Sequence, residues 1–192
     1  MEPIYTQGKT FDKTDFNAEP FQKGEYEECK FTNCDFSNTN LSDCKFIDCL
    51  FDNCNLSMAK MIKTAFRNVN FKNCKMLGLR FDLCNEFGLT VAFDSCNLSH
   101  ASFYRVKLKK TFFKNLKLHE ADFTESDLSG SLFTNCDFYR AMFDNTILEK
   151  ADLRSAINYS INPEHNRIKG ARFSLTGIAG LLEKYDIEID MS

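Results

Sequence analysis

Large apolar residues recur at every fifth position along most of the chain. From Phe11 to Phe81, and again from Phe93 to Leu153, every site reached in steps of five is Phe, Leu, Met or Tyr. Neither a helix with a period of 3.6 residues nor a strand with a period of two keeps such a register over seventy positions. The pattern predicts a solenoid, in which the chain turns after each five-residue unit and each coil stacks on the next.

A second, smaller residue lies two positions before most of the large ones, as at Cys29, Thr39, Ala59, Ala101 and Ser126. Residues two apart in an extended chain point to the same face, so each unit sends one small and one large side chain inward. One coil buries little by itself. It becomes stable when neighbouring coils cover it at the inter-strand spacing of about 4.8 Å.

Several units carry the pattern A(D/N)LXX, including ADFTE at 121–125, SDLSG at 126–130 and ADLRS at 151–155. In these units the chain resembles the pentapeptide-repeat family. The resemblance implies an all-β fold, a right-handed quadrilateral β-helix with four units in each coil. Fifteen and thirteen units in the two runs then give about seven coils and a rod about 35 Å long.

The repeat runs through nearly all of the 192 residues, which predicts one β-helix over 1–173 followed by a short C-terminal segment, 174–192. Twelve residues separate Phe81 from Phe93, so 82–92 must absorb two extra residues. This segment is either a corner irregularity or a functional loop, and Gly88 permits unusual backbone angles there. Because Pro163 falls on a large-residue site, residues 158–170 are expected to loop out around the last coil.

Ser174 is suited to cap a short helix with one apolar stripe, and alternating Ile and acidic residues after it suggest a brief strand. This apolar tail either covers the last coil or contacts a second copy, and the two uses are compatible. The segment 181–187 resembles the C-terminal end of the quinolone-resistance (Qnr-type) members and their mycobacterial relative, in which this end forms a head-to-head dimer. The resemblance places a homodimer interface on Ile178, Leu181, Leu182, Tyr185, Ile187 and Ile189.

Nine cysteines all occupy the small inward position, most often five residues apart, rather than the close pairs that converge with His in metal sites. We therefore interpret them as small apolar fillers with free thiols and predict neither a metal nor a cofactor. Cys34, Cys54 and Cys74 are twenty residues apart and are expected to stack at a spacing that permits a disulfide in an oxidising compartment.

The chain shows no signal-peptide pattern and no apolar run of eighteen residues, so we expect a soluble, cytoplasmic protein without a membrane contact. His100, His119 and His165 belong to no motif that links them to a nucleophile, and no phosphate-binding glycine loop is present. The sequence therefore predicts a binding protein rather than an enzyme, because solenoids generally work by presenting an extended surface.

The family resemblance implies a rod that imitates duplex DNA and binds a bacterial type II topoisomerase, DNA gyrase or topoisomerase IV, thereby conferring quinolone resistance or inhibiting the enzyme. The chain has twenty-seven acidic and twenty-four basic residues, and its net negative charge is far smaller than that of duplex DNA of the same length. Any imitation of DNA must therefore be local. The candidate acidic surface lies in the second run and comprises Glu120, Asp122, Glu125, Asp127, Asp137, Asp144, Glu149 and Asp152.

Two alternatives remain open for this exterior. The lysines at 107, 109, 110, 114 and 117 would repel a basic DNA-binding saddle if they shared a side with the carboxylates. The first alternative is that these charges form an ordinary solvated exterior. The second is that the rod is a pentapeptide-repeat scaffold that binds another, unknown protein partner and makes no contact with a topoisomerase. Direct nucleic-acid binding is disfavoured by the net acidic charge and the lack of a basic face with exposed aromatics.

Overall fold

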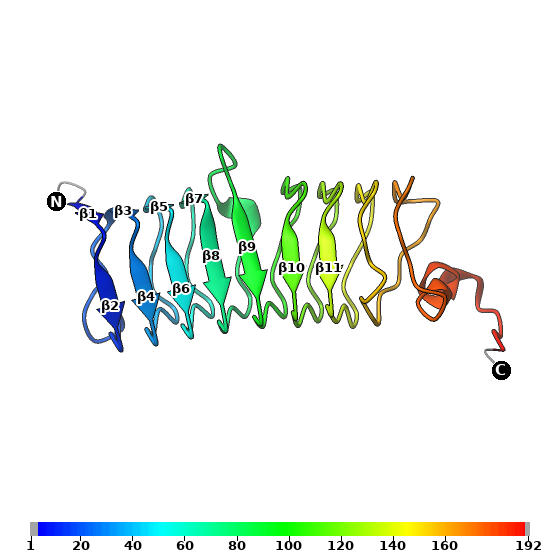
Figure 1. Cartoon of the computed structure of the whole chain (residues 1–192), viewed down its shortest axis with the longest axis horizontal. Helices are drawn as coiled ribbons and strands as arrows, with labels where there is room; N and C mark the ends of the chain where they lie inside the picture. The colour runs from blue at the N-terminus through cyan, green and yellow to red at the C-terminus, as the bar shows by residue number, and fades with distance from the viewer. Residues whose placement is uncertain (1–3, 191–192) are drawn as a thin grey trace.

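The computed structural model describes residues 4–190, which form a four-sided parallel β-solenoid of about seven turns (Figure 1). Each strand pairs with the one twenty residues further along, as Phe11 does with Phe31. Between Phe71 and Phe93 the step is twenty-two. The predicted fold class is confirmed.

Two parallel sheets cover two sides of the rod. The seven-stranded sheet forms side A, with the order β11-β10-β9-β8-β6-β4-β2, and the four-stranded sheet β1-β3-β5-β7 begins side D. The strands are β1 (Ile4–Gln7), β2 (Thr10–Asp12), β3 (Gly24–Glu27), β4 (Lys30–Thr32), β5 (Lys45–Ile47), β6 (Leu50–Asp52), β7 (Ala65–Arg67), β8 (Val69–Lys72), β9 (Val91–Asp94), β10 (Phe112–Lys114) and β11 (Leu132–Thr134).

Sides B and C consist of tight turns joined by single parallel bridges. On side B the bridges run from Asp15 to Ile157, and on side C they include Ser102 to Asp122 and Asp122 to Met142. Side D continues beyond β7 in the same bridged form through Asp127. Many of these turns are stabilised by an Asp or Asn before the large residue that accepts the backbone N–H two residues on, as Asp35 does from Ser37 at 2.7 Å.

The large residues of the repeat fill the interior as stacked columns. The Phe31 and Phe51 rings are parallel with centroids 4.7 Å apart, and Phe103 and Phe123 repeat this at 4.9 Å on side C. These side chains are fully buried. The predicted core is confirmed, and the columns explain why five-residue spacing tolerates so few polar exceptions.

The small inward residues do more than fill space. Cys49, Cys54 and Cys136 place their thiols 3.2–3.4 Å from the carbonyl of the residue twenty-three positions earlier, in the coil below. Thr64 and Thr146 donate to the corresponding carbonyl at 2.8 Å. Burial raises the pKa of Cys49 and Cys136 to about 12, which keeps each thiol protonated as a donor. The apolar-filler interpretation therefore misses a hydrogen bond between coils, which also explains why Cys, Ser and Thr interchange here.

The two extra residues between the runs form a projecting loop between β8 and β9 in sequence (Figure 1). It begins with the 3-10 helix η1 (Phe81–Leu83), where Arg80 makes a two-point ion pair with Asp82. Phe87 is 75% exposed in this loop, with the Arg67 guanidinium 5.7 Å from its ring centroid. Gly88 has φ of +72°, the left-handed conformation that glycine adopts without strain.

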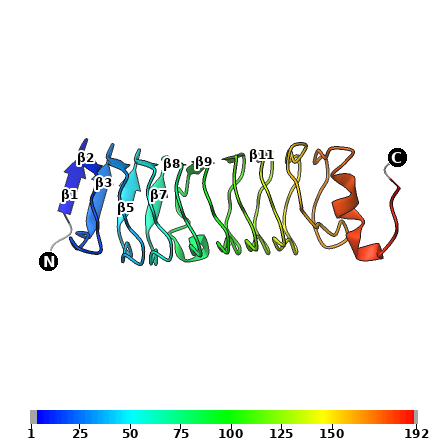
Figure 2. The same cartoon turned by 90° about the horizontal axis from the view of Figure 1, so that it is seen from below.

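The C-terminal end differs from expectation in two ways. Residues 158–170 stay in the coil, since Arg167 bridges to Ile147 and Tyr159 and Ile161 are buried. The expected helix consists only of two 3-10 turns, η2 (Ile178–Leu181) and η3 (Glu183–Tyr185), and the described residues up to 190 contain no strand after them. These turns lie across the last coil (Figure 2).

Two glycines let the C-terminal turns pack closely against Tyr159. A side chain at Gly177 would meet the Tyr159 hydroxyl at 2.1 Å, and one at Gly180 would meet the Tyr159 carbonyl oxygen at 2.1 Å. Ser174 accepts a hydrogen bond from the Gly177 backbone N–H, so it caps the turn before η2. Glycines that weaken a helix are needed here to let the cap approach the rod.

Candidate interaction surfaces

The eight predicted carboxylates do not share one face. Asp137 bridges along side B, Asp122 along side C, Asp127 along side D, and Asp152 pairs with Leu132 of β11 on side A. The remaining four follow the large residues of sides B, C and D at their corners. The structure brings one pair together, Glu125 with Asp144 on consecutive coils, where the Glu125 backbone N–H donates to the Asp144 carbonyl.

Seven of the eight carboxylates face a basic side chain. Two of the pairs at 2.7 Å are Glu125 with Arg105 and Glu149 with Arg167. The other contacts are Asp127 with Lys109, Asp152 with Arg154, and Glu120, Asp137 and Asp144 with His100, His119 and His165, respectively. Only Asp122 has no ion-pair partner among residues 4–190, so the exterior is a patchwork of opposite charges.

Four of these carboxylates also stabilise the turns. Asp122, Asp127, Asp137 and Asp152 each accept the backbone N–H two residues later, at 2.9–3.2 Å. These bonds belong to the Asp of the A(D/N)LXX unit. The acidic residue of the repeat therefore has a structural role before any partner binds.

These contacts explain why several carboxyl pKa values are low. Hydrogen bonds from Arg105 lower the pKa of Glu125, and those from Arg154 lower that of Asp152. Burial opposes the ionisation of Asp137, but hydrogen bonds from His119 and Asn158 outweigh it, so its pKa also lies below the ordinary value. These contacts favour the ionised form of Glu125, Asp137 and Asp152, and the same contacts place basic side chains beside the negative charge.

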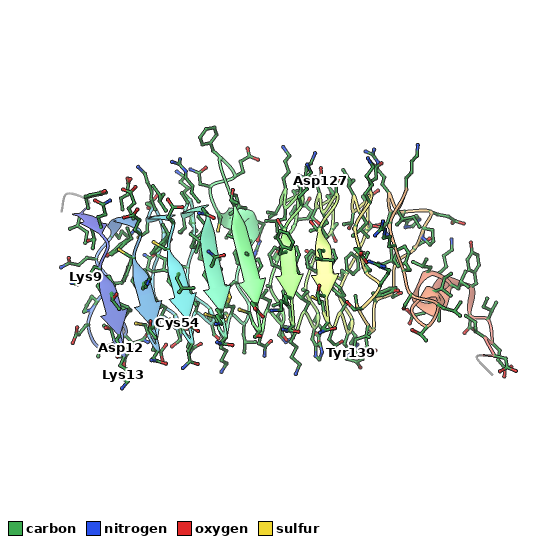
Figure 3. All side chains as sticks on the ribbon, viewed as in Figure 1. Lys9, Asp12, Lys13, Cys54, Asp127 and Tyr139 are labelled. Atoms are coloured by element: carbon green, nitrogen blue, oxygen red, sulfur yellow. The ribbon has the colours of Figure 1, made fainter. Side chains whose placement is uncertain are left out.

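The lysine cluster is likewise split among sides. Lys107, Lys109 and Lys110 belong to side D, whereas Lys114 lies on side A and Lys117 on side B. Lys109 pairs with Asp127 at 3.0 Å and Lys114 with Asp94 at 3.0 Å. Figure 3 shows that side chains project from the rod along its whole length.

The predicted dimer residues separate into a cap and an exposed rim. Leu181 is buried against the last coil, and the Gly180 carbonyl accepts a hydrogen bond from the Ile161 backbone N–H. Ile178, Tyr185, Ile187 and Ile189 are exposed to 36–56%. Leu182, Ile187 and Ile189 line a hollow of about 550 Å³ together with Tyr139 and Tyr159. The tail is therefore a cap that still presents apolar side chains to solvent.

Exposed aromatics on the outside of the rod are the features that the repeat pattern left unnoticed. Phe112 in β10 is 63% exposed and Phe87 of the loop 75%. Phe112 lies one position before the buried Phe113, on the outward face of β10. Sorting the sequence by twenty-residue coils, with the two-residue shift, would have revealed Phe112 beside Leu132 on one column.

Two kinds of site are not found within residues 4–190. No group of three or more His, Cys, Asp or Glu side chains is arranged to hold a metal ion. None of the helical turns in this part of the chain has the length and apolarity needed to cross a bilayer.

The family model described as "Pentapeptide repeat region" matches residues 24–86 and 89–160. The chain belongs to the pentapeptide-repeat family. The two matched segments flank the tip of the projecting loop, where the five-residue register shifts. No curated protein sequence matches this member.

Solved structures with the same fold have different described roles. Full-length QnrB1, a plasmid-mediated fluoroquinolone resistance protein, is 19% identical over 96% of this chain and 100% of its own, with a TM-score of 0.62. HetL, involved in heterocyst differentiation regulation in the cyanobacterium Nostoc sp. strain PCC 7120, is 16% identical over 91% of this chain and 88% of its own, with a TM-score of 0.63. At these identities the likeness concerns the fold.

Proposed function

We propose that this pentapeptide-repeat protein is a non-enzymatic binding rod whose partner is a bacterial type II topoisomerase, DNA gyrase or topoisomerase IV. The observation that carries the proposal is that segment 120–144 places Asp122, Glu125 and Asp144 along side C with Glu120 at its edge, and that Asp122 makes no ion pair within residues 4–190, although its charge adds to the larger effect of Asp82 in raising the pKa of Arg80 in the same column. A negative patch of this kind suits a surface that otherwise grips DNA phosphates. The near-complete overlap with QnrB1 supports the same partner class.

The ion pairs set the mode of binding. Arg105 forms an ion pair with Glu125, and His165 lies 3.4 Å from Asp144. A partner must therefore displace these basic side chains or bind the carboxylates while the pairs persist. Both pairs are exposed, and exposed pairs contribute little free energy. We therefore propose local rather than global imitation of DNA, with Asp122 as the central contact.

We further propose that two rods join through their C-terminal ends. The exposed Ile178, Tyr185, Ile187 and Ile189 surround the hollow beside η2 and η3, while Leu181 continues to cap its own coil. Such a dimer places two side C clusters on one elongated particle. Replacing Ile187 by Asp should then abolish this end-to-end association at low micromolar concentration in sedimentation experiments without lowering the melting temperature.

The test is a supercoiling assay with purified gyrase or topoisomerase IV at rising rod concentration, with and without a fluoroquinolone. We expect inhibition or relief from the drug, and loss of either effect in the Asp122→Lys, Asp144→Lys double variant. The matched control is Glu28→Lys, an exposed carboxylate near the other end. Equal activity of the double variant and the wild type would contradict the side C assignment.

A second candidate is a scaffold for a different protein partner, favoured by the patchwork of ion pairs over all four sides. Absence of binding to either topoisomerase at tens of micromolar would select this candidate. Affinity capture with wild type and the Phe87→Ala variant would then show whether the exposed loop contacts that partner.

A further inference from the structure

The outward side chains of the seven-stranded sheet form a column whose charges are antisymmetric about its centre. The strand register places one residue of each strand in this column, directly after the buried Phe, and the period extends it by one coil beyond β11. In order along the rod the column reads Asp12, Thr32, Asp52, Lys72, Asp94, Lys114, Thr134, Arg154.

The centre of this column lies between β8 and β9. A two-fold axis placed there, parallel to the strands, brings a second rod face to face in the antiparallel direction and opposes the column to itself. Every opposed pair is then complementary or neutral. The pairs are Lys72 with Asp94, Asp52 with Lys114, Thr32 with Thr134, and Asp12 with Arg154.

Shifting the axis by half a strand spacing removes this complementarity. Centring it on β9 opposes Asp94 to Asp94 and Lys72 to Lys114, and centring it on β8 opposes Asp52 to Asp94. Like charges directly opposed are unfavourable. The column thus favours one register over its two neighbours. Lys72 makes no ion pair within residues 4–190, so its charge is available to a second copy.

The adjacent column supplies apolar contacts in the same register. Phe112, 63% exposed, is opposed to Leu50 of the second copy, and both line a hollow of about 270 Å³ with Asn70 and Ala92. Figure 1 looks directly onto this sheet, whose strands lie side by side with the projecting loop at its edge. An exposed aromatic on a flat sheet and a hollow beside it form a self-complementary surface.

We propose that side A is a homotypic interface, through which two copies of this chain associate face to face and antiparallel about an axis between β8 and β9. Seven strands at about 4.8 Å and three residues at about 3.3 Å give a footprint of about 340 Å². This is below the roughly 800 Å² per partner of a standard interface, so the association is weak and depends on concentration. It is distinct from the proposed C-terminal dimer.

The test uses a pair of charge reversals in analytical ultracentrifugation at 5–500 µM. Lys72→Asp opposes Asp to Asp94 twice in a homodimer, and Asp94→Lys opposes Lys to Lys72 twice. We expect each variant alone to associate at least about tenfold more weakly than the parent protein. An equimolar mixture restores two complementary pairs and should associate like the wild type.

Three controls keep the experiment decisive. Ile187→Asp in every protein removes the proposed end-to-end contact, so only side A is measured. Lys60→Asp, on side C, should leave association unchanged, and equal melting temperatures establish that the variants are folded. A monomeric Ile187→Asp protein at 500 µM, single reversals that associate like their parent, or a mixture that stays monomeric would each overturn the proposal.

Discussion

Side A and side B are built from the same five-residue unit but have different backbones. On side A the large residue follows Lys30, Leu50 or Phe112, and the chain is extended into strands. On side B it follows Asp35 or Asp137, whose side chain accepts the N–H two residues later and tightens the unit into a turn. An Asp before the large residue therefore reinforces the turn but does not by itself decide the backbone, because Lys75 and Lys117 occupy that position in side B turns and Asn70 occupies it in β8.

This difference changes how an acidic exterior should be interpreted. Asp122, Asp127, Asp137 and Asp152 are engaged in turns, whereas the described contacts of Glu120 and Glu125 are made to side chains of neighbouring coils. A carboxylate in the repeat signature is first a backbone acceptor.

The largest expected effect concerns the buried columns of Phe side chains, which strand sides and turn sides share. Phe123→Asp should unfold the second run, because it buries an unpaired charge between the rings of Phe103 and Phe143 and costs at least about 4 kcal/mol. Phe113→Asp on side A should do the same. Circular dichroism and limited proteolysis check this, and a folded variant with an unchanged melting temperature would remove the inward assignment.

A smaller effect should separate the sides. Asp137→Ala removes the turn acceptor together with contacts to His119 and Asn158, so we expect a loss of about 1–2 kcal/mol in urea unfolding. Asp137→Asn keeps the acceptor and should lose less. Thr134→Ala, on side A, is the matched control with an expected change within about 0.5 kcal/mol. Equal losses for all three would show that the turn bond contributes nothing.

Acid should weaken the turns in the same way. The folded pKa values of Asp137 and Asp152 are lowered, so the stability that they contribute is present above the unfolded value of about 3.9 and is lost as pH falls below it. The urea midpoint should therefore drop between pH 5 and pH 3. The Asp137→Asn, Asp152→Asn variant should show a shallower drop, and an identical pH profile would contradict this origin.

The smallest effect concerns the inward thiols. Cys54→Ala removes a small group and its contact with the Phe31 carbonyl, for an expected cost of about 1 kcal/mol or less. Cys54→Ser keeps a donor and should recover part of that cost. Loss of a bound metal on either change, measured by elemental analysis, would overturn the interpretation of the cysteines as structural.

The core was predictable because the large apolar residue recurs at every fifth position, so the same position of every unit must face the interior. Phe31, Phe51 and Leu128, which are fully buried, illustrate this. The ion pairs were less accessible: a coil of twenty residues places Arg105 and Glu125 on successive coils, but whether the two side chains meet depends on their conformations, which the repeat does not fix. At the C-terminus, side-chain periodicity predicted an amphipathic helix, but the segment forms only 3-10 turns, in which Gly180 packs closely against Tyr159, a contact that periodicity does not encode.

The strand register across the projecting loop has a consequence for how such chains evolve. The rings of Phe71 and Phe93 stack on successive coils although the coil between them is two residues longer than the others. A corner can therefore gain residues while the columns on either side keep their partners. Insertion or loss of a whole coil, as a block of sixty nucleotides, should likewise change the length of the rod and leave both of its ends intact.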